Sequence, residues 1–158
     1  MPPRSSLPLL AVLLVVGCAA DAAEEPSFTP VVDVPQLMVS VIEPAAEVYW
    51  DAVGWIVDEE GTHEIVPRTP EEWEAVRNAA VVLAESGNLL LMGSRKLDDG
   101  AWVAMARAMT EVGRRAAEAA ETMDPDSVFE VGGEVYAACT ACHARYALET
   151  LRPSERDE

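Results

Sequence analysis

Apolar residues recur at spacings of three and four along most of the chain, which is the pattern of helices that bury one face. The pattern predicts a first helix over residues 35–56 and a second over residues 69–90. A third follows from about 98 to 123, and a fourth runs from about 124 to 150. Short turn signals separate the four segments. The fold class expected from the pattern is therefore all-α, as a helical bundle.

Local signals mark some boundaries more sharply than others. Pro44 lies inside the first predicted helix and should kink or divide it, because proline cannot donate a helical hydrogen bond. Residues 58–68 are predicted to form a loop. Thr69, Pro70 and Glu72 form a capping-box pattern at the start of the second helix, with the proline at the first helical position.

The N-terminus reads as a targeting segment rather than as part of the fold. Arg4 supplies a positive start, and residues 7–16 form an apolar run that is too short to span a bilayer. Val15-Val16-Gly17-Cys18 resembles the lipobox of bacterial lipoproteins, which implies a signal peptide over residues 1–17 and a lipid anchor on Cys18. The alternative is an ordinary secretory signal cleaved within residues 19–23.

The rest of the chain divides into three parts. Residues 18–34 have the composition of a flexible tether, residues 35–150 form the domain, and residues 151–158 form a charged tail expected to be disordered. A lipid-anchored periplasmic protein is expected. Because no Asp follows Cys18 directly, resemblance to lipoprotein sorting favours the outer membrane.

Charge narrows the choice of partners. The chain has 11 basic and 28 acidic residues, giving a formal net charge of −17. Nucleic acid and anionic lipid surfaces repel such a protein, whereas a protein with a basic or neutral docking face is a suitable partner. Acidity that serves only solubility is the alternative explanation.

One motif carries specific chemistry. Cys139-Thr140-Ala141-Cys142-His143 is a C-x-x-C-H sequence, which is the signature of covalent haem attachment. Cysteines three residues apart share one face of a helix, so both can reach the vinyl groups at one edge of a porphyrin. His143 follows directly and can turn its imidazole to the iron.

Three other uses of the cysteines are possible. A thioredoxin-like redox pair needs a βαβ setting and a helix N-terminus close to the thiols. A zinc site needs a fourth ligand, for which His63 is the only other histidine. A disulfide between residues three apart in a regular helix is strained.

The segment from Gly132 to Tyr146 resembles the haem-binding helix of the class II cytochromes c, the family that includes cytochrome c′. The resemblance covers residues 35–150. It implies an antiparallel up-and-down four-helix bundle with one covalent haem c near the last helix. Cys139 and Cys142 would hold the haem, and His143 would bind its iron. Family members often form dimers, so a homodimer is possible here.

The resemblance also places the second axial ligand on the first helix. Low-spin members of the family supply a Met there, and Met38 is the Met on this helix. Packing in the core is the alternative role for Met38. The other helical methionines are expected in the core or on the surface, and His63 in solvent. Large aromatics are expected to be structural, with Tyr136 and Phe129 favoured over Trp50 and Trp55 as haem neighbours.

The function expected from these features is electron transfer in the periplasm by a c-type cytochrome that is not an enzyme. The alternative is a five-coordinate haem protein that binds nitric oxide or carbon monoxide, as cytochrome c′ does. A thiol-disulfide redox protein is the third hypothesis. Met38 distinguishes the first two, because only the electron carrier requires it on the iron.

Overall fold

The computed structural model describes residues 28–147. These residues are mostly helical, with four long helical segments and one two-stranded hairpin. The signal peptide, Cys18, most of the predicted tether and the tail lie outside the described residues. The elements in chain order are α1 (Val34–Leu37), a π-helical turn (Met38–Ile42), α2 (Glu43–Trp50), β1 (Gly54–Asp58), β2 (Gly61–Ile65), α3 (Pro70–Leu90), a 3₁₀ turn (Gly93–Arg95), α4 (Ala101–Glu121) and α5 (Pro125–Tyr146).

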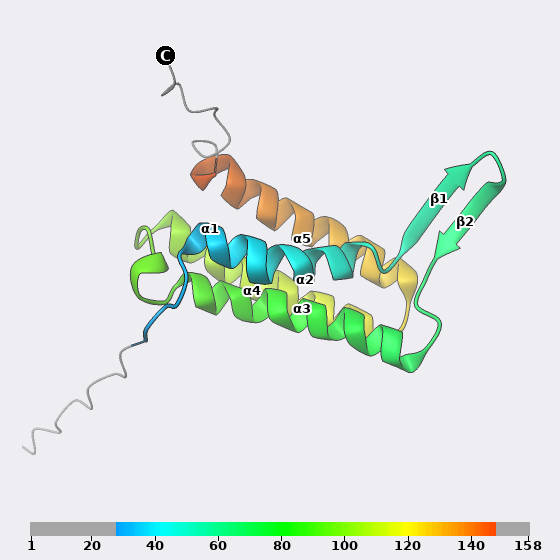
Figure 1. Cartoon of the computed structure of the whole chain (residues 1–158), viewed down its shortest axis with the longest axis horizontal. Helices are drawn as coiled ribbons and strands as arrows, with labels where there is room; N and C mark the ends of the chain where they lie inside the picture. The colour runs from blue at the N-terminus through cyan, green and yellow to red at the C-terminus, as the bar shows by residue number, and fades with distance from the viewer. Residues whose placement is uncertain (1–27, 148–158) are drawn as a thin grey trace, which may run out of the picture.

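The helices pack mainly against their neighbours in sequence. α1, the π turn and α2 follow one another without a break and together form the N-terminal helix, residues 34–50. α3 packs against α4 most extensively, α4 against α5, and α2 against α3, whereas α2 and α5 touch only briefly. Figure 1 shows α5 diverging from the N-terminal helix toward its own C-terminal end. No helix in the described part of the chain is long and apolar enough to cross a membrane.

Glycine and alanine allow α3 and α4 to approach closely. A Cβ on Gly113 would overlap the backbone of Ala84, and a Cβ on Gly87 would overlap Thr110 and the backbone carbonyl of Ala106. Ala80 and Ala116 are fully buried at 0% exposure. Small residues on both helices therefore set their separation.

The predicted capping box of the second helix is confirmed. The Thr69 hydroxyl accepts a hydrogen bond from the Glu72 backbone N–H at 3.2 Å, and the Glu72 carboxylate accepts one from the Thr69 N–H at 3.1 Å. The hydrogen bonds that the Glu72 carboxylate accepts from the backbone N–H groups of Arg68 and Thr69 lower the pKa of Glu72. α3 begins at Pro70, as the sequence indicated.

The predicted extent of the first helix was wrong, and so was the loop expected over residues 58–68. The helix ends at Trp50, and an antiparallel hairpin follows, with Trp55 opposite Glu64 and Asp58 opposite Gly61. Gly54 and Gly61 adopt φ of 156° and 133°, which side-chain-bearing residues rarely adopt. The β-branched residues between them favour an extended backbone. The hairpin projects from the end of the helices (Figure 1).

Pro44 widens the N-terminal helix rather than breaking it. Proline has no N–H to donate to the Ser40 carbonyl four residues earlier, and its ring would clash with that carbonyl in an α-helix. The helix instead forms a π turn, in which the Glu43 N–H bonds to the Met38 carbonyl five residues back. The predicted disturbance at Pro44 is therefore present as a π turn.

The start of the N-terminal helix is fixed to the far end of α3. The guanidinium of Arg95 is buried and donates to the carbonyl of Val32 at 3.0 Å and to that of Leu89 at 3.3 Å. The Asp33 carboxylate accepts from the Gln36 N–H and caps α1. The end of the predicted tether thus contacts the helical body.

Candidate functional site

The C-x-x-C-H motif lies near the C-terminal end of α5. Asp124 caps this helix by accepting from the Asp126 N–H at 3.2 Å, and Pro125 occupies its first turn. From there α5 runs without interruption to Tyr146. Cys139 and Cys142 are half-buried, and His143 is exposed.

The motif borders a cavity of about 450 Å³ between α5 and the N-terminal helix. Met38 lines the same cavity from the N-terminal helix, so the structure brings all four predicted haem-site residues of the described chain to one place. The other lining residues are mostly apolar and come from four helices: Ile42, Glu43, Ala46, Trp50, Leu90, Trp102, Met105, Ala106, Met109, Tyr136, Ala138 and Thr140.

The π turn keeps Met38 in line with the rest of its wall. Met38, Ile42, Ala46 and Trp50 are spaced by four residues, and such a stripe drifts by about 40° per step in an α-helix. A π turn holds more residues per turn, so the step from Met38 to Ile42 rotates the other way and offsets the drift. Pro44 therefore influences where Met38 points.

α4 supplies a wall that the sequence did not reveal. Trp102, Met105, Ala106 and Met109 share one face of this helix and line the cavity. The 3.6-residue period placed them together, but nothing in the sequence showed that this face borders the motif. Trp102 is 3% exposed, and its indole N–H donates to the Leu90 carbonyl at 2.8 Å, which fixes the ring in the wall.

Asp98 connects the end of α5 to the start of α4. Its carboxylate accepts from the Tyr146 hydroxyl at 2.5 Å, from the Trp102 N–H at 3.0 Å and from the Gly100 N–H at 2.8 Å. These bonds, led by that from Tyr146, lower the pKa of Asp98. The Tyr146 ring also meets Trp102 edge to face, with centroids 5.0 Å apart. The helix turn that carries His143 is thereby held to α4.

The thiols are poorly suited to redox catalysis. Burial raises the pKa of both Cys139 and Cys142, and the neighbouring Cys142 raises that of Cys139 further. A reactive thiolate needs a lowered pKa, of the kind found at helix N-termini. Here the motif is at the opposite end of a 22-residue helix, where the helix dipole disfavours a negative charge.

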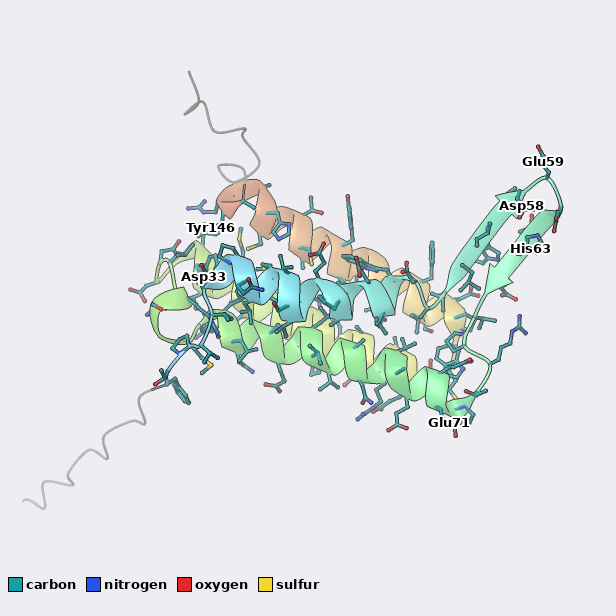
Figure 2. The ribbon with its side chains drawn as sticks, in the orientation of Figure 1. Asp33, Asp58, Glu59, His63, Glu71 and Tyr146 are labelled. Carbon is teal, nitrogen blue, oxygen red and sulfur yellow. The ribbon has the colours of Figure 1, made fainter. Side chains whose placement is uncertain are left out.

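The donor set also fails to make a zinc site. Within residues 28–147, no three His, Cys, Asp or Glu side chains come together in a way that could hold a metal ion. His63 lies on the hairpin, 3.2 Å from Asp58, far from the motif (Figure 2). Both cysteines are free rather than joined in a disulfide. An iron porphyrin requires less of the protein, because the ring supplies four of the ligands.

The lining of the cavity fits a haem. Its volume lies in the range of about 300–1,000 Å³ typical of ligand pockets, and its walls are mainly aliphatic, aromatic and thioether groups, which suit a flat hydrophobic ring. Two thiols and one imidazole lie along one wall, and a thioether lies on the N-terminal helix across from them. These are the attachment and ligand groups that a haem c uses.

Two of the four aromatics considered as haem neighbours line the cavity. Tyr136 and Trp50 do so, and their rings touch edge to face with centroids 6.1 Å apart. Phe129 and Trp55 lie outside it and pack on each other, with centroids 5.6 Å apart.

No family model, curated protein or solved structure matches the chain. Function is therefore inferred from the cavity and from the side chains that line it.

Proposed function

We propose that the chain is a c-type cytochrome of the class II type, which holds one covalent haem between α5 and the N-terminal helix and transfers electrons. One observation carries the proposal: Cys139, Cys142 and His143 share an apolar cavity with Met38, which comes from a different helix. In this proposal the four helical segments are the up-and-down four-helix bundle of that family.

Each residue has a distinct role in the proposed site. The thiols of Cys139 and Cys142 would hold the haem through thioether bonds to its two vinyl groups, with each thiol hydrogen going to the other vinyl carbon. His143 on α5 and Met38 on the N-terminal helix would be the protein's ligands to the iron. The bound haem would supply a one-electron Fe(III)/Fe(II) couple. Met38 as a thioether ligand stabilises the reduced state.

The walls of the cavity tune the site by excluding water. Ile42, Leu90 and Met109 are 5 to 7% exposed and contribute aliphatic and thioether surface. A low-polarity setting disfavours the more highly charged ferric state and raises the reduction potential. Met38 on the wall across from the motif favours the electron carrier over a five-coordinate protein that binds nitric oxide or carbon monoxide.

The proposed location is the periplasm, with the lipidated Cys18 as anchor. The apolar run and the lipobox-like sequence support this location, and covalent haem attachment is expected outside the cytoplasm. The acidic charge supports a protein partner with a basic or neutral face rather than a nucleic acid.

A pyridine haemochrome spectrum tests the proposal. The full chain, produced with a c-type maturation system, should show a c-type spectrum with one haem per chain and no free thiol at Cys139 or Cys142. A Cys139→Ser/Cys142→Ser variant should lose the covalent haem while keeping its helical circular dichroism. A purified wild-type protein with both thiols free and no haem under these conditions would contradict the proposal.

A further inference from the structure

An exposed apolar surface extends from the cavity to the hairpin. Tyr136 and Trp50 lie at the rim of the cavity, and Phe129 lies two turns before Tyr136 on α5. Trp55 of β1 packs on Phe129, and Val57 lies on the same strand face as Trp55. These five residues, here called the aromatic strip, are 36 to 77% exposed. Such large apolar groups in one connected surface are typical of an interaction site.

The strip is hollowed at its centre. A depression of about 330 Å³ lies between Phe129 and Tyr136, separate from the main cavity. Gly132 and Gly133 form part of its floor, and apart from the adjacent backbone of α5 no atom lies within 4 Å of where a Cβ on Gly133 would be. The depression can therefore accept an apolar side chain of a partner.

Acidic residues border the strip. Residues 34–65 contain seven Asp and Glu and no Lys or Arg. Glu64 lies directly opposite Trp55 across the hairpin, and Figure 2 shows Asp58 and Glu59 at the hairpin's outer end. The Lys and Arg ion pairs within residues 28–147 go to other carboxylates, so none neutralises Glu59, Glu60 or Glu64.

We propose that the aromatic strip and its acidic border form the docking surface for a redox protein that presents an apolar centre surrounded by Lys and Arg. The proposal rests on the proposed function and names its partner surface. Complementary charge guides such a partner to the strip, and the strip supplies the apolar contact. A partner seated there would cover Tyr136 and Trp50 at the rim of the cavity that is proposed to hold the haem.

The same charges argue against a second copy of this chain as the occupant. Two identical surfaces would bring two acidic 34–65 segments together without a Lys or Arg from either, which costs electrostatic energy. An anionic membrane surface is repelled for the same reason. The basic partner is the occupant that fits both the apolar and the charged parts of the surface.

Mitochondrial cytochrome c, a small basic haem protein, can serve as the probe. It would be titrated at low ionic strength into the isotope-labelled full chain, and backbone amide shifts would be followed by NMR. We expect shifts to concentrate in residues 54–65 and 129–136 and to vanish as salt is raised. Glu59→Gln/Glu60→Gln should weaken binding by about tenfold. Glu74→Gln/Glu85→Gln changes the charge equally on exposed positions of α3 and should have little effect.

A second pair of variants tests the apolar contact. Val57 is 77% exposed, so Val57→Thr should fold normally and weaken binding at any salt concentration at which binding is measurable. Val81→Thr on α3 is its control. Equal effects of target and control variants would overturn the proposal, as would shifts located elsewhere. A dimer in sedimentation velocity that Val57→Thr dissociates would also overturn it, in favour of a second copy.

Haem content, measured separately, distinguishes the two proposals. A chain that binds haem covalently but shows no shifts in the strip supports the proposed function and overturns the docking surface. A chain that carries no haem but binds the probe through the strip supports the docking surface and overturns the proposed function.

Discussion

Two helix interfaces in this protein differ in kind. α3 and α4 are held close by Gly87, Gly113 and alanines, and a single added methyl at either glycine would overlap the facing helix. The N-terminal helix and α5 meet only at one end, where the Trp50 indole donates to the Gly132 carbonyl at 3.1 Å. At the other end they enclose the cavity. The closely packed α3–α4 interface thus supports a second interface, between the N-terminal helix and α5, that stays open for a ligand.

The two interfaces also differ in charge. Arg77 and Arg114 make ion pairs with glutamates across or along the α3 and α4 surface. The N-terminal helix and hairpin contain no Lys or Arg. The packed side therefore combines acidic and basic side chains, whereas the N-terminal helix and hairpin carry unpaired negative charge that a partner could use.

The largest expected effect is the difference in stability between adding one methyl group at the α3–α4 interface and adding one on α5. Gly113→Ala should lower the free energy of unfolding by about 1–3 kcal/mol, because the new methyl must displace the backbone of Ala84. Gly133→Ala on α5 should raise it by up to about 1 kcal/mol, because alanine favours the helix and meets nothing. Urea unfolding of both variants measures the difference. Equal destabilisation by the two substitutions would contradict the difference in packing between the two interfaces.

The next largest effect concerns the π turn of the N-terminal helix, which borders the cavity. Pro44→Ala allows residue 44 to donate to the Ser40 carbonyl, so the π turn should revert to an α-helix and Met38 should rotate away from the cavity. We expect a higher Tm together with a partly high-spin reduced spectrum. Pro35→Ala, in the first turn where no donor is needed, is the control and should keep the low-spin spectrum. An unchanged spectrum in Pro44→Ala would show that the turn does not position Met38.

Burial of the thiols makes both the thiol reactivity and the stability of the haem-free chain depend on pH. Because the pKa of Cys139 and of Cys142 is raised above the ordinary value of 9.0, alkylation should require a higher pH in the folded chain than in urea. The stability linked to the protonated thiols is present below pH 9 and is lost as the pH rises through the folded-state values. Alkylation rates followed by mass spectrometry check this. Faster alkylation in the folded chain would indicate an activated thiol and support a redox enzyme.

The smallest expected effect is at the junction of Asp98 and Tyr146. Because the pKa of Asp98 is lowered in the folded chain, the Asp98 carboxylate contributes to folding stability above its ordinary pKa of 3.8. This contribution is lost as the pH falls through the pKa of the folded state. Tyr146→Phe removes the leading hydrogen bond and should reduce the loss of stability on acidification. Thermal melts between pH 6 and about 3 test it. An identical pH profile in the variant would show that the bond contributes nothing.

The sequence predicted features that depend on local chemistry. Thr69, Pro70 and Glu72 marked the start of α3 through a cap that needs no distant contact. Pro125 and the apolar period likewise placed Cys139 on the last helix. In contrast, Trp55 and Ile56 were assigned to the end of the first helix, because consecutive apolar residues have no period of their own. Gly54 and Gly61, which redirect the chain into a hairpin, were the signal that could have corrected this.

Features set by tertiary packing could not be predicted in the same way. Met105 and Met109 were expected in the core or on the surface, and Met109 is indeed in the buried core, but the sequence did not show that both line the cavity. Their position depends on how α4 is rotated against α5, and that rotation follows from close packing on α3 through Gly113. Helical period gives the face of one helix but not the element that it meets.

The most direct test of the central claim is an NMR spectrum of the reduced haem-bound protein with labelled methionine methyl groups. An iron-bound Met lies against the haem plane, so its methyl resonance is shifted strongly upfield by the ring current. We expect one such resonance, present in Met105→Leu and Met109→Leu and absent in Met38→Leu. That result places the haem between α5 and the N-terminal helix. A spectrum with no shifted methyl, or one whose shifted methyl belongs to Met105 or Met109, would contradict the account.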